Sequence, residues 1–409
     1  MFATLKAAMF AGTLMMIAAS AKAADIPSAC TYLSGLVDPE AGPTFLASYP
    51  TVTAGSLHGV AFLYDNAVAS IALIGCGETE RARAIDDAIV WALAHDRAWH
   101  DGRLRNGYAA GAAKESPIEP VKRWDQETNR WRDDWYQAGS DTGNMAWAML
   151  ALLALDRVSP DAKYRDGAVK IGTWVAGHLD TRGAGGFTGG SKSPDSAPVD
   201  VTWKSTEHNT DLVAAFTLLA RSTHDAVWSE RATLAERFVQ AMWDNSCGCF
   251  AVGTTDDGVT RSAMIALDAQ ISPLLALPGM AASPYAASLS TTEGHLRVRD
   301  GFTYSEAGRG VWTEGTAEVA LLQRLEGHTR EWTELTALVN AQRRPDGSFY
   351  ATSPAPLPTG FGDANDPTIQ SFYYPIPHLA PAAWAALAER GFNPFLASAG
   401  LPDKALPDR

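Results

Sequence analysis

Six stretches of the chain each place a polar residue in front of a run of small and apolar residues. These polar residues are Asp65, Asp141, Glu207, Asp268, Glu314 and His378. Each run is apolar on nearly all sides, which predicts a helix that is buried all round. The six positions follow one another at a mean step of roughly 63 residues, so we interpret them as an internal repeat.

Segments of a different kind lie between these runs. Residues 81–95, 164–179 and 231–243 each have one apolar and one charged face, which is typical of helices that face water. Several are followed by a stretch of glycine and aromatic residues, at 101–110, 185–190, 247–253 and 346–352, which predicts a short hairpin or loop. Six inner helices alternating with six outer helices predict an all-α (α/α)6 toroid with short β-hairpins or loops at its rim.

The first 23 residues have the character of a signal peptide. Lys6 precedes an uncharged apolar run from Ala7 to Ala19, and Ala21-Lys22-Ala23 offers a cleavage site. The run is too short for a transmembrane helix, and no later stretch is apolar enough for one. We therefore expect residues 1–23 to be removed and residues 24–409 to form a single catalytic domain. The mature protein should be periplasmic or extracellular, without stable membrane insertion.

The composition is that of an acidic, tryptophan-rich globular protein. Of 409 residues, 46% are apolar and 19% charged, which suffices for a large core. The net charge is −13, and −15 without the two lysines of the first 23 residues, so nucleic acid and anionic membranes are poor partners. Trp, at 13, is nearly as frequent as Phe, at 14. Because aromatic faces stack on sugar rings, a carbohydrate is the expected partner, and the negative charge favours a neutral glycan.

Four cysteines form an even set: Cys30, Cys76, Cys247 and Cys249. In an oxidising compartment they allow three pairings, one of which closes a small loop between Cys247 and Cys249 and joins Cys30 to Cys76. A metal site is the rival interpretation, but no histidine or third ligand stands at the required spacing. Nucleotide-binding and metal-binding motifs are absent too, so we expect neither a cofactor nor a metal.

The acidic residues that open the inner helices are the strongest candidates for chemistry. In a toroid the N-terminal ends of the inner helices lie on one rim, where the helix dipoles favour negative charge. Helix capping is the alternative, and Asp141 has the position of an N-cap behind Ser140. Capping explains one acid per helix, but not the Trp, Tyr, His and Asn around the acids. We expect the catalytic groups among Asp141, Glu207 and Glu314.

The surroundings of these acids supply the candidates for substrate binding. The sequence WKSTEHNTD (203–211) around Glu207 is too polar to begin a buried helix unless it faces a cavity. Gly315 would let a ligand approach the backbone beside Glu314. Two alternatives stay open: His208 as a core histidine, and Glu318 either orienting Glu314 or pairing with a Lys or Arg. The substrate-binding candidates are Asp65, Trp135, Tyr136, Trp203, His208, Asn209, Asp211, Asp268, Trp312, Tyr373, Tyr374 and His378.

Five segments resemble the six-hairpin glycosidase superfamily, and more narrowly a set of exported bacterial proteins. They are YDNAVASIAL, GSDTGNMAWAMLALL, KSTEHNTDL, VWTEGTAEVAL and YYPIPHLAPAAWAALAERGFNPF, within residues 60 to 395. The resemblance implies hydrolysis of a polysaccharide or oligosaccharide, and many members invert the anomeric configuration with a Glu acid and an Asp or Glu base. Family 8 endoglucanases carry a Ser-Glu-Gly acid motif, which Thr313-Glu314-Gly315 matches in part.

The hypothesis that follows is a secreted glycoside hydrolase. Two carboxyl groups would flank one bond, one protonated as the acid and one ionised to activate water. We expect two of Asp141, Glu207 and Glu314 in these roles, with Glu207 as the acid. Three alternatives remain: a non-catalytic glycan-binding protein, a sugar epimerase, and a polysaccharide lyase that uses His208, Asn209, Tyr373, Tyr374 or His378.

Overall fold

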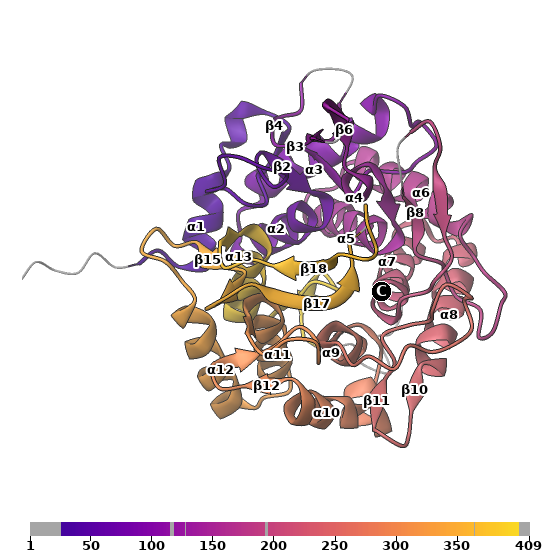
Figure 1. Cartoon of the computed structure of the whole chain (residues 1–409), viewed down its shortest axis with the longest axis vertical. Coiled ribbons are helices and arrows are strands. Elements are labelled where there is room, and N and C mark those ends of the chain that lie inside the picture. Colours follow the sequence, from indigo (N-terminus) through magenta and orange to yellow (C-terminus); the bar gives the residue numbers. More distant parts are fainter. Residues whose placement is uncertain (1–25, 115–117, 127, 193–194, 364, 401–409) are drawn as a thin grey trace, which may run out of the picture.

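Six inner helices form a ring in the computed structural model, which describes residues 26–114, 118–126, 128–192, 195–363 and 365–400. They are α2 (Leu63–Cys76), α5 (Thr142–Val158), α7 (Thr206–Thr223), α9 (Leu267–Ala276), α11 (Thr313–Leu325) and α13 (Leu379–Arg390). Each inner helix packs against the next one, and α13 returns onto α2 (Figure 1). All six begin within two residues of the polar positions that open the predicted runs.

Six further helices cover the ring from outside. They are α1 (Ala29–Leu36), α3 (Thr79–His95), α6 (Ala162–Ala176), α8 (Ala226–Ala241), α10 (Ala287–His295) and α12 (Thr329–Ala341). Helix α1 packs on α13 more extensively than α12 does, so the first helix of the chain completes the last pair. The predicted (α/α)6 toroid is confirmed. One additional short helix, α4 (Trp135–Ala138), lies at the rim.

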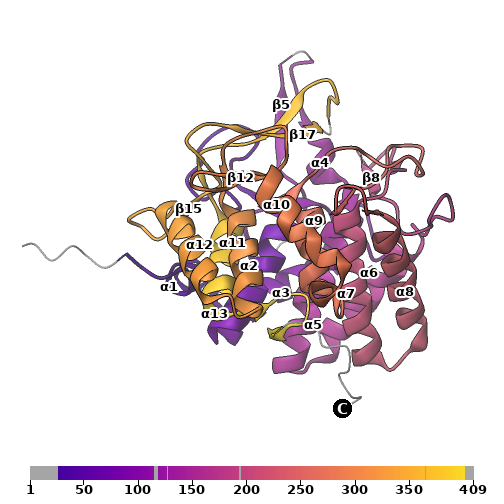
Figure 2. The same cartoon turned by 90° about the horizontal axis from the view of Figure 1, so that it is seen from below.

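Most of the strands are carried by the segments that lead from an outer helix to the next inner helix. The connections from α2 to α3, α5 to α6 and α7 to α8 are short turns, whereas the return connections are long. The return connections therefore gather at the end of the ring where the inner helices begin (Figure 2). The candidate side chains at the helix starts are consequently framed by these loops.

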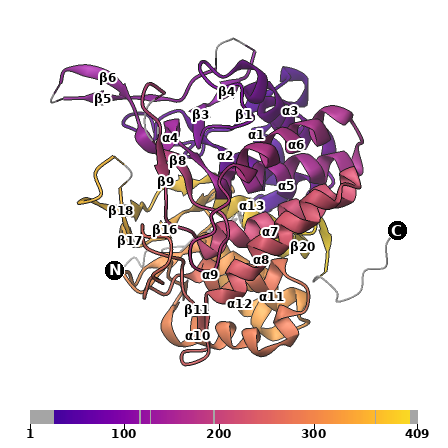
Figure 3. The same cartoon turned by 90° about the vertical axis from the view of Figure 1, so that its right-hand side faces the viewer.

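The described strands pair in two-stranded sheets, except for one three-stranded sheet of β7, β8 and β9. Their bounds are β1 (Thr44–Phe45), β2 (Val60–Phe62), β3 (Gly107–Ala109), β4 (Gly111–Ala112), β5 (Lys122–Asp125), β6 (Arg130–Asp133), β7 (Ser140–Asp141), β8 (Gly190–Lys192), β9 (Val199–Val201), β10 (Trp243–Asp244), β11 (Cys249–Phe250), β12 (Arg297–Val298), β13 (Gly301–Phe302), β14 (Val311–Trp312), β15 (Phe349–Tyr350), β16 (Thr352–Ser353), β17 (Leu357–Gly362), β18 (Gln370–Tyr373), β19 (Pro377–His378), β20 (Phe392–Asn393) and β21 (Ser398–Ala399). Short 3-10 turns occupy Pro39–Ala41, Met280–Ala282 and Pro284–Ala286. The hairpin β5–β6 projects from the rim, on the same side as β17 and β18 (Figure 3).

The predicted glycine and aromatic stretches form the rim in two ways. Residues 247–253 close the hairpin β10–β11, as expected. Residues 101–110 and 346–352 instead pair with the short strands in front of inner helices: β3 with β2, β15 with β19, and β16 with β14. The stretches thus connect neighbouring repeats rather than folding only on themselves.

A repeated hydrogen bond fixes these stretches to the helices. The fourth residue of α2, α7, α9 and α11 is Asn66, Asn209, Gln270 and Thr316, and each accepts from the backbone N–H of an apolar residue in an adjacent loop or short strand. In α7, Asn209 accepts from Phe187 N–H at 2.8 Å and donates to Phe187 and Ser205 carbonyls at 3.0 and 2.8 Å. Because buried polar groups need partners, this contact holds a loop against each helix start. The repeat is therefore visible in bonding as well as in hydrophobicity.

Both disulfides pair neighbours in the fold. Cys30 of α1 is bonded to Cys76 at the end of α2, and Cys247 to Cys249 in the turn between β10 and β11. The disulfide interpretation is thereby confirmed, with the pairing that joins Cys30 to Cys76. The predicted signal peptide, residues 1–23, lies outside the described residues. Among the described helices, none has the length and apolar character needed to cross a membrane.

Candidate functional site

Acidic residues from four inner helices, α2, α7, α9 and α11, act on one another electrostatically at the rim. The charges of Asp65 and Glu207 raise the pKa of Glu314, and those of Glu207, Glu314 and Asp211 raise the pKa of Asp268, after the larger effect of burial in both cases. Coulombic influence of this kind in a partly desolvated site requires proximity. The carboxyl groups therefore form one cluster, although they are far apart in sequence.

Capping does not account for these acids. The helices α2, α5, α9 and α11 begin without any side-chain capping bond, and α7 is capped by Ser205, whose hydroxyl accepts from the His208 N–H. Asp141 occupies the N-cap position of α5 without bonding the helix. The carboxyl groups at the rim are thus left for other contacts.

Glu314 is held by a chain of hydrogen bonds. Its Oε1 accepts from the Tyr64 hydroxyl, whose oxygen accepts from the Trp384 indole N–H at 2.7 Å. Burial raises the pKa of Glu314 to about 7, although the His378 charge and the Tyr64 hydrogen bond lower it. Both the acid and the base form of this carboxyl are accordingly populated near neutral pH.

Glu207 and Asp141 share this raised pKa but differ from Glu314 in exposure. Burial raises the pKa of each to about 7, and for Asp141 the Asn106 side chain and the Lys192 charge act in the opposite direction. Both side chains are half-buried, whereas Glu314 is only 2% exposed. Asn106 also accepts from the Asp141 backbone N–H at 2.7 Å, which fixes the residue at the start of α5.

A second group of carboxyls is nearly inaccessible to solvent. Asp211 and Glu318 follow Glu207 and Glu314 by one helical turn, and burial raises their pKa values, and that of Asp268, well above the ordinary range. The Asp268 side chain opposes the rise of the Glu318 pKa, so Glu318 faces an acid rather than a Lys or Arg. Neither carboxyl oxygen of Asp211 has a hydrogen bond of ordinary geometry. The Trp147 side chain is the group that lowers the pKa of this carboxyl. Burial therefore favours the neutral form of these carboxyls.

His378 is paired with Asp65. Its Nε2 lies 2.8 Å from Oδ2 of Asp65, and its ring stacks on Tyr49 with centroids 4.5 Å apart. Burial lowers the pKa of His378, but the charge and hydrogen bond of Asp65 and the charge of Glu314 outweigh it, so the pKa is raised. A cationic group is therefore favoured next to Glu314.

His208 has the opposite character. Burial lowers its pKa to about 4, so the imidazole is neutral at pH 7. It is half-buried, with Nδ1 3.3 Å from the Thr142 hydroxyl and its ring 5.5 Å from that of Trp203. A Cβ atom at Gly143 would lie 2.5 Å from its Cδ2, so this glycine leaves the space that the imidazole fills. The alternative of a core histidine does not fit this place on the rim.

The predicted aromatic residues divide into exposed and buried ones. Trp135, Tyr136 and Tyr374 are exposed and Trp203 is half-buried. Trp312, by contrast, is packed between Tyr304 and Tyr373, at centroid distances of 4.8 and 5.6 Å. The exposed side chains remain available to a sugar ring.

Two sequence-based assignments change with the tertiary contacts. A Cβ atom at Gly315 would lie 2.3 Å from Cε3 of Trp312, so the space beside this glycine is taken by the indole and not by a ligand. Asn209 uses its amide entirely on the backbone of Phe187 and Ser205, which leaves it no free group for a substrate. Asp65, Asp211 and Asp268 belong to the acid cluster, but Asp65 is paired with His378 and is only 2% exposed.

Three tyrosines of the site are missing from the sequence-based candidates: Tyr49, which is buried, and Tyr64 and Tyr304, which are half-buried. Burial and neighbouring acids raise their pKa values well above the ordinary range; the acids are Asp65 and Glu314 for Tyr49, and Asp268, Glu207 and Glu314 for Tyr304. Tyr64 directly precedes Asp65 and could have been selected on that ground. Tyr49 and Tyr304 lie in loops with no pattern that marks them.

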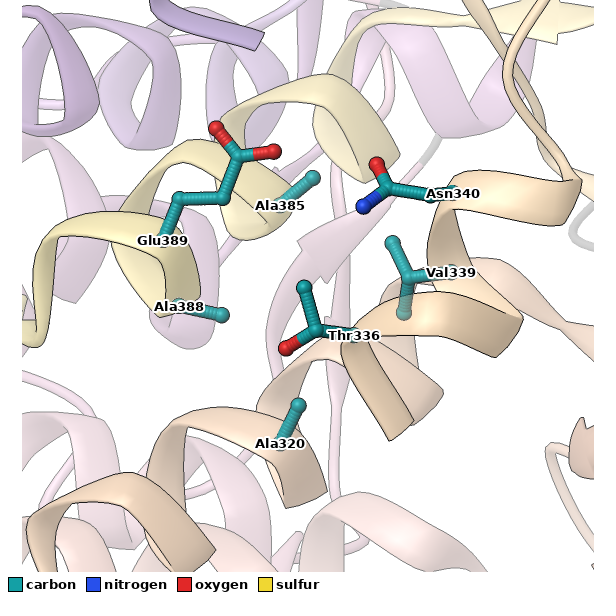
Figure 4. Close-up of a pocket in the computed structure, with 7 residues that line it drawn as sticks. All are labelled: Ala320, Thr336, Val339, Asn340, Ala385, Ala388 and Glu389. Atoms are coloured by element: carbon teal, nitrogen blue, oxygen red, sulfur yellow. The ribbon is translucent and has the colours of Figure 1, made fainter. Parts of the chain in front are cut away.

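Two crevices elsewhere in the structure are unrelated to the acids. One lies between α11, α12 and α13 and has no room for a water-sized molecule (Figure 4). Its Glu389 carboxyl is bound by Arg343 at 3.0 Å. The other is an open hollow of about 290 Å³ lined by residues of α10, β12 and α12, including Glu293 and Arg297. In the described ranges, no group of three or more His, Cys, Asp or Glu could hold a metal ion.

The fold of this chain is similar to that of known proteins. No protein-family model matches this sequence, and no curated protein matches it significantly. A glycosidase variant in complex with glucose matches with TM-score 0.60 and 13% identity, over 88% of this chain and 94% of its own. This chain has the six-hairpin (α/α)6 fold.

Two epimerases share this fold with the chain. Cellobiose 2-epimerase from Bacillus thermoamylovorans matches with TM-score 0.58 and 13% identity, over 88% of this chain and 95% of its own. A sugar epimerase from a ruminal bacterium gives 0.59 and 11%, over 90% and 97%. The resemblance to the six-hairpin glycosidase superfamily is thereby confirmed for the fold.

Proposed function

We propose that the protein is a glycoside hydrolase that cleaves a neutral oligosaccharide or polysaccharide by carboxylate acid and base catalysis. The observation that carries the proposal is that Glu207 and Glu314 meet in the acid cluster while Asp141 and Glu207 both act on Tyr136, and that each of the three carboxyls has a pKa of about 7. Exposed Trp135 and Tyr136 beside them provide faces for sugar rings. The glycosidase and epimerases of the same fold support a sugar as the substrate.

The environments of the carboxyls distinguish their roles. For Glu207, burial is what raises the pKa, and nothing opposes it, so its neutral form is favoured and it suits the acid. For Glu314, the Tyr64 hydrogen bond and the His378 charge favour the anion, which suits the base. Asp141, with Asn106 and Lys192 beside it, would hold the substrate or replace Glu314 as the base.

The proposed reaction is a single displacement. The Glu207 carboxyl donates its proton to the glycosidic oxygen as the bond from that oxygen to the anomeric carbon breaks. Glu314 takes a proton from water, whose oxygen attacks the anomeric carbon from the opposite face. This inverting mechanism requires the two carboxyls to be separated by roughly 6.5–9.5 Å, which leaves room for the water.

A sugar epimerase is the second candidate, favoured by two histidines whose pKa values shift in opposite directions. The lowered pKa of His208 suits a proton acceptor, whereas the raised pKa of His378 suits a proton donor. An epimerase would rearrange a sugar without breaking the glycosidic bond. The two candidates therefore differ in their products.

The test is proton NMR of the products formed from a panel of neutral glycans: cellobiose, maltose, mannobiose, xylobiose and the corresponding soluble polysaccharides. New reducing ends that appear first as the inverted anomer support the hydrolase. A new isomer without new reducing ends supports the epimerase, and a product that absorbs in the ultraviolet would indicate a lyase. Binding without any product would leave a glycan-binding protein and overturn the proposal.

Export is a separate part of the proposal. Residues 1–23 would direct secretion and be removed, so that the protein acts in the periplasm or outside the cell. Both disulfides are compatible with an oxidising compartment. N-terminal sequencing of the protein from the periplasmic fraction tests this, and an intact Met1 in the cytoplasmic fraction would contradict it.

A further inference from the structure

A hairpin crosses the ring over the starts of the inner helices. This crossing hairpin, formed by β17 and β18, lies across the middle of the ring (Figure 1). Its β17 strand is fixed where Ser305, in the connection before α11, donates to the Thr359 carbonyl at 2.7 Å. Leu357 at the same end is fully buried. One end of the hairpin is therefore anchored beside α11.

The turn of the crossing hairpin is anchored on the opposite side. Asn365 accepts from the Trp135 backbone N–H at 2.8 Å and donates to Oδ2 of Asp134 at 3.1 Å. Asp134 also caps α4, the short helix directly before α5. Because the ring order is α2, α5, α7, α9, α11, α13, the helices α11 and α5 face each other across the ring. The two anchors thus span a full diameter.

The two halves of the ring on either side of the hairpin differ in exposure. In the half with α13 and α2, Asp65, His378 and Tyr49 are 2%, 4% and 8% exposed, while Tyr374 in the connection to α13 is 44% exposed. In the half that begins with α5 and α7, Asp141, Glu207, His208 and Trp203 are half-buried, and Tyr136 is 38% exposed. Solvent therefore reaches the acid cluster from the side of α5 and α7.

The exposed aromatic residues continue in this direction. The hairpin β5–β6 leads into α4 and projects from the rim (Figure 3). Its cross-strand pair Trp124 and Trp131 is 45% and 64% exposed, with ring centroids 5.4 Å apart. Exposed indoles on a projecting hairpin offer a stacking surface outside the acid cluster.

We propose that the crossing hairpin makes the site a pocket closed at the α13–α2 side, which takes one end of a glycan chain, while the rest of the chain leaves past Trp135 towards Trp131. The inference rests on the proposed function and adds the substrate class: chain ends and short oligosaccharides rather than the interior of a polymer. Cleavage within a chain needs sugar units on both sides of the bond, and the sealed half provides no path for one of them. Asn365 is the residue that keeps the pocket closed.

The variant Asn365→Asp tests this because it places a carboxylate against Asp134. The matched control is Thr368→Ala in the same turn, whose hydroxyl bonds only Asp366 at 2.7 Å. On any polysaccharide of the panel that is cleaved, the wild-type protein and the control should release reducing ends with little loss of viscosity. Asn365→Asp should lower the viscosity several-fold more for each reducing end released. A wild-type protein that lowers viscosity from the first cleavages overturns the inference while leaving the hydrolase intact.

Trp131→Ala tests the direction in which the chain leaves. We expect it to raise KM on the polymer several-fold and leave KM on the disaccharide unchanged, because only a long substrate reaches β5–β6. An equal effect on both substrates, or none on either, would contradict this path.

Hydroxyl-radical footprinting tests the closure without any substrate. Tyr136 should be oxidised readily and Tyr49 protected in the wild-type protein and in Thr368→Ala, and Asn365→Asp should raise the oxidation of Tyr49 several-fold. If no glycan is cleaved, the proposed function fails and this measurement still decides the closure. Equal oxidation of Tyr49 in all three proteins would show that the hairpin does not close the pocket.

Discussion

The Nε2 atom of His378 lies 2.8 Å from Oδ2 of Asp65, and this contact joins the start of α13 to the first turn of α2. It links the last inner helix to the first across 313 positions of sequence. The pair is buried, and the raised pKa of His378 favours a cation next to Glu314. The same contact therefore closes the ring and tunes a proposed catalytic carboxyl.

Removing the charge of Asp65 should destabilise the fold in a pH-dependent way. We expect Asp65→Asn to lower the free energy of unfolding by about 3 kcal/mol, because it leaves a buried imidazolium without its partner. The folded-state pKa of His378 lies above its unfolded value, so the stabilisation is fully present below about pH 6.5 and is lost as the pH rises through the raised value. Urea unfolding at about pH 5.5 and about pH 9 should show the larger loss at the lower pH.

The matched control for this variant is an exposed pair of the same kind. His295 Nδ1 lies 2.8 Å from Oε1 of Glu306, with both side chains well exposed. Glu306→Gln should cost less than about 1 kcal/mol because solvent screens the pair. Equal losses for Asp65→Asn and Glu306→Gln would show that burial of the His378 pair contributes nothing.

The three rim carboxyls should differ from other acids in their effect on turnover. Glu207→Gln and Glu314→Gln should each lower kcat by about 10²- to 10⁴-fold, since each removes a proton donor or acceptor. Asp141→Asn should act mainly on KM if it binds substrate. Glu236→Gln on α8, where the carboxylate bonds only Gln240 at 2.9 Å, is the control and should retain full activity. Full activity in both glutamine variants at the rim would refute the assignment.

The pH optimum should move when Tyr64 is changed. The Tyr64 hydrogen bond lowers the pKa of Glu314, so Tyr64→Phe should raise that pKa further. With Glu314 as the base, the acidic limb of kcat/KM against pH then shifts to higher pH. Tyr164→Phe, which removes a hydroxyl bonded to Asp87 at 2.7 Å between the outer helices α3 and α6, should leave the profile unchanged. A shift of the alkaline limb instead would assign Glu314 as the acid.

Glu207 should reduce stability at neutral and higher pH. Its folded-state pKa of about 7 exceeds its ordinary value, so the folded protein binds more protons than the unfolded chain between pH 4 and 7. The free energy of unfolding therefore falls as the pH rises through this range. Glu207→Gln should match the wild type near pH 4 and exceed it at about pH 8, as measured by urea unfolding. An equal difference at both pH values would contradict the raised pKa.

Gly315 should tolerate no side chain, whereas Gly294 should. A methyl group at Gly315 would press on Trp312, so Gly315→Ala should cost about 1–3 kcal/mol and change the tryptophan fluorescence. A Cβ atom at Gly294 in α10 would meet nothing within 4 Å. Gly294→Ala should therefore stabilise the protein, by up to about 1 kcal/mol, through helix propensity. A higher midpoint of thermal unfolding for Gly315→Ala than for Gly294→Ala would disprove this packing.

Prediction from sequence succeeded where the signal is local. The run after Glu207 predicts the helix that begins at Thr206, and the run after Glu314 predicts the one that begins at Thr313. Helix periodicity and the polar residue in front of it depend only on neighbours along the chain. For the same reason, Tyr49 and Tyr304 escaped notice, because only long-range contacts bring them to the acids.

The sequence by itself determined the ring of helices and the rim on which its acids meet, because both follow from a repeated pattern of apolar and polar residues. Tertiary structure decided the rest. It engaged the Asn209 amide with the backbone, filled the space beside Gly315 with Trp312, and paired His378 with Asp65. It also set the pKa of each carboxyl and left the acid cluster accessible to solvent from the side of α5 and α7. These properties depend on desolvation and on contacts between residues far apart in the chain, which no local pattern contains.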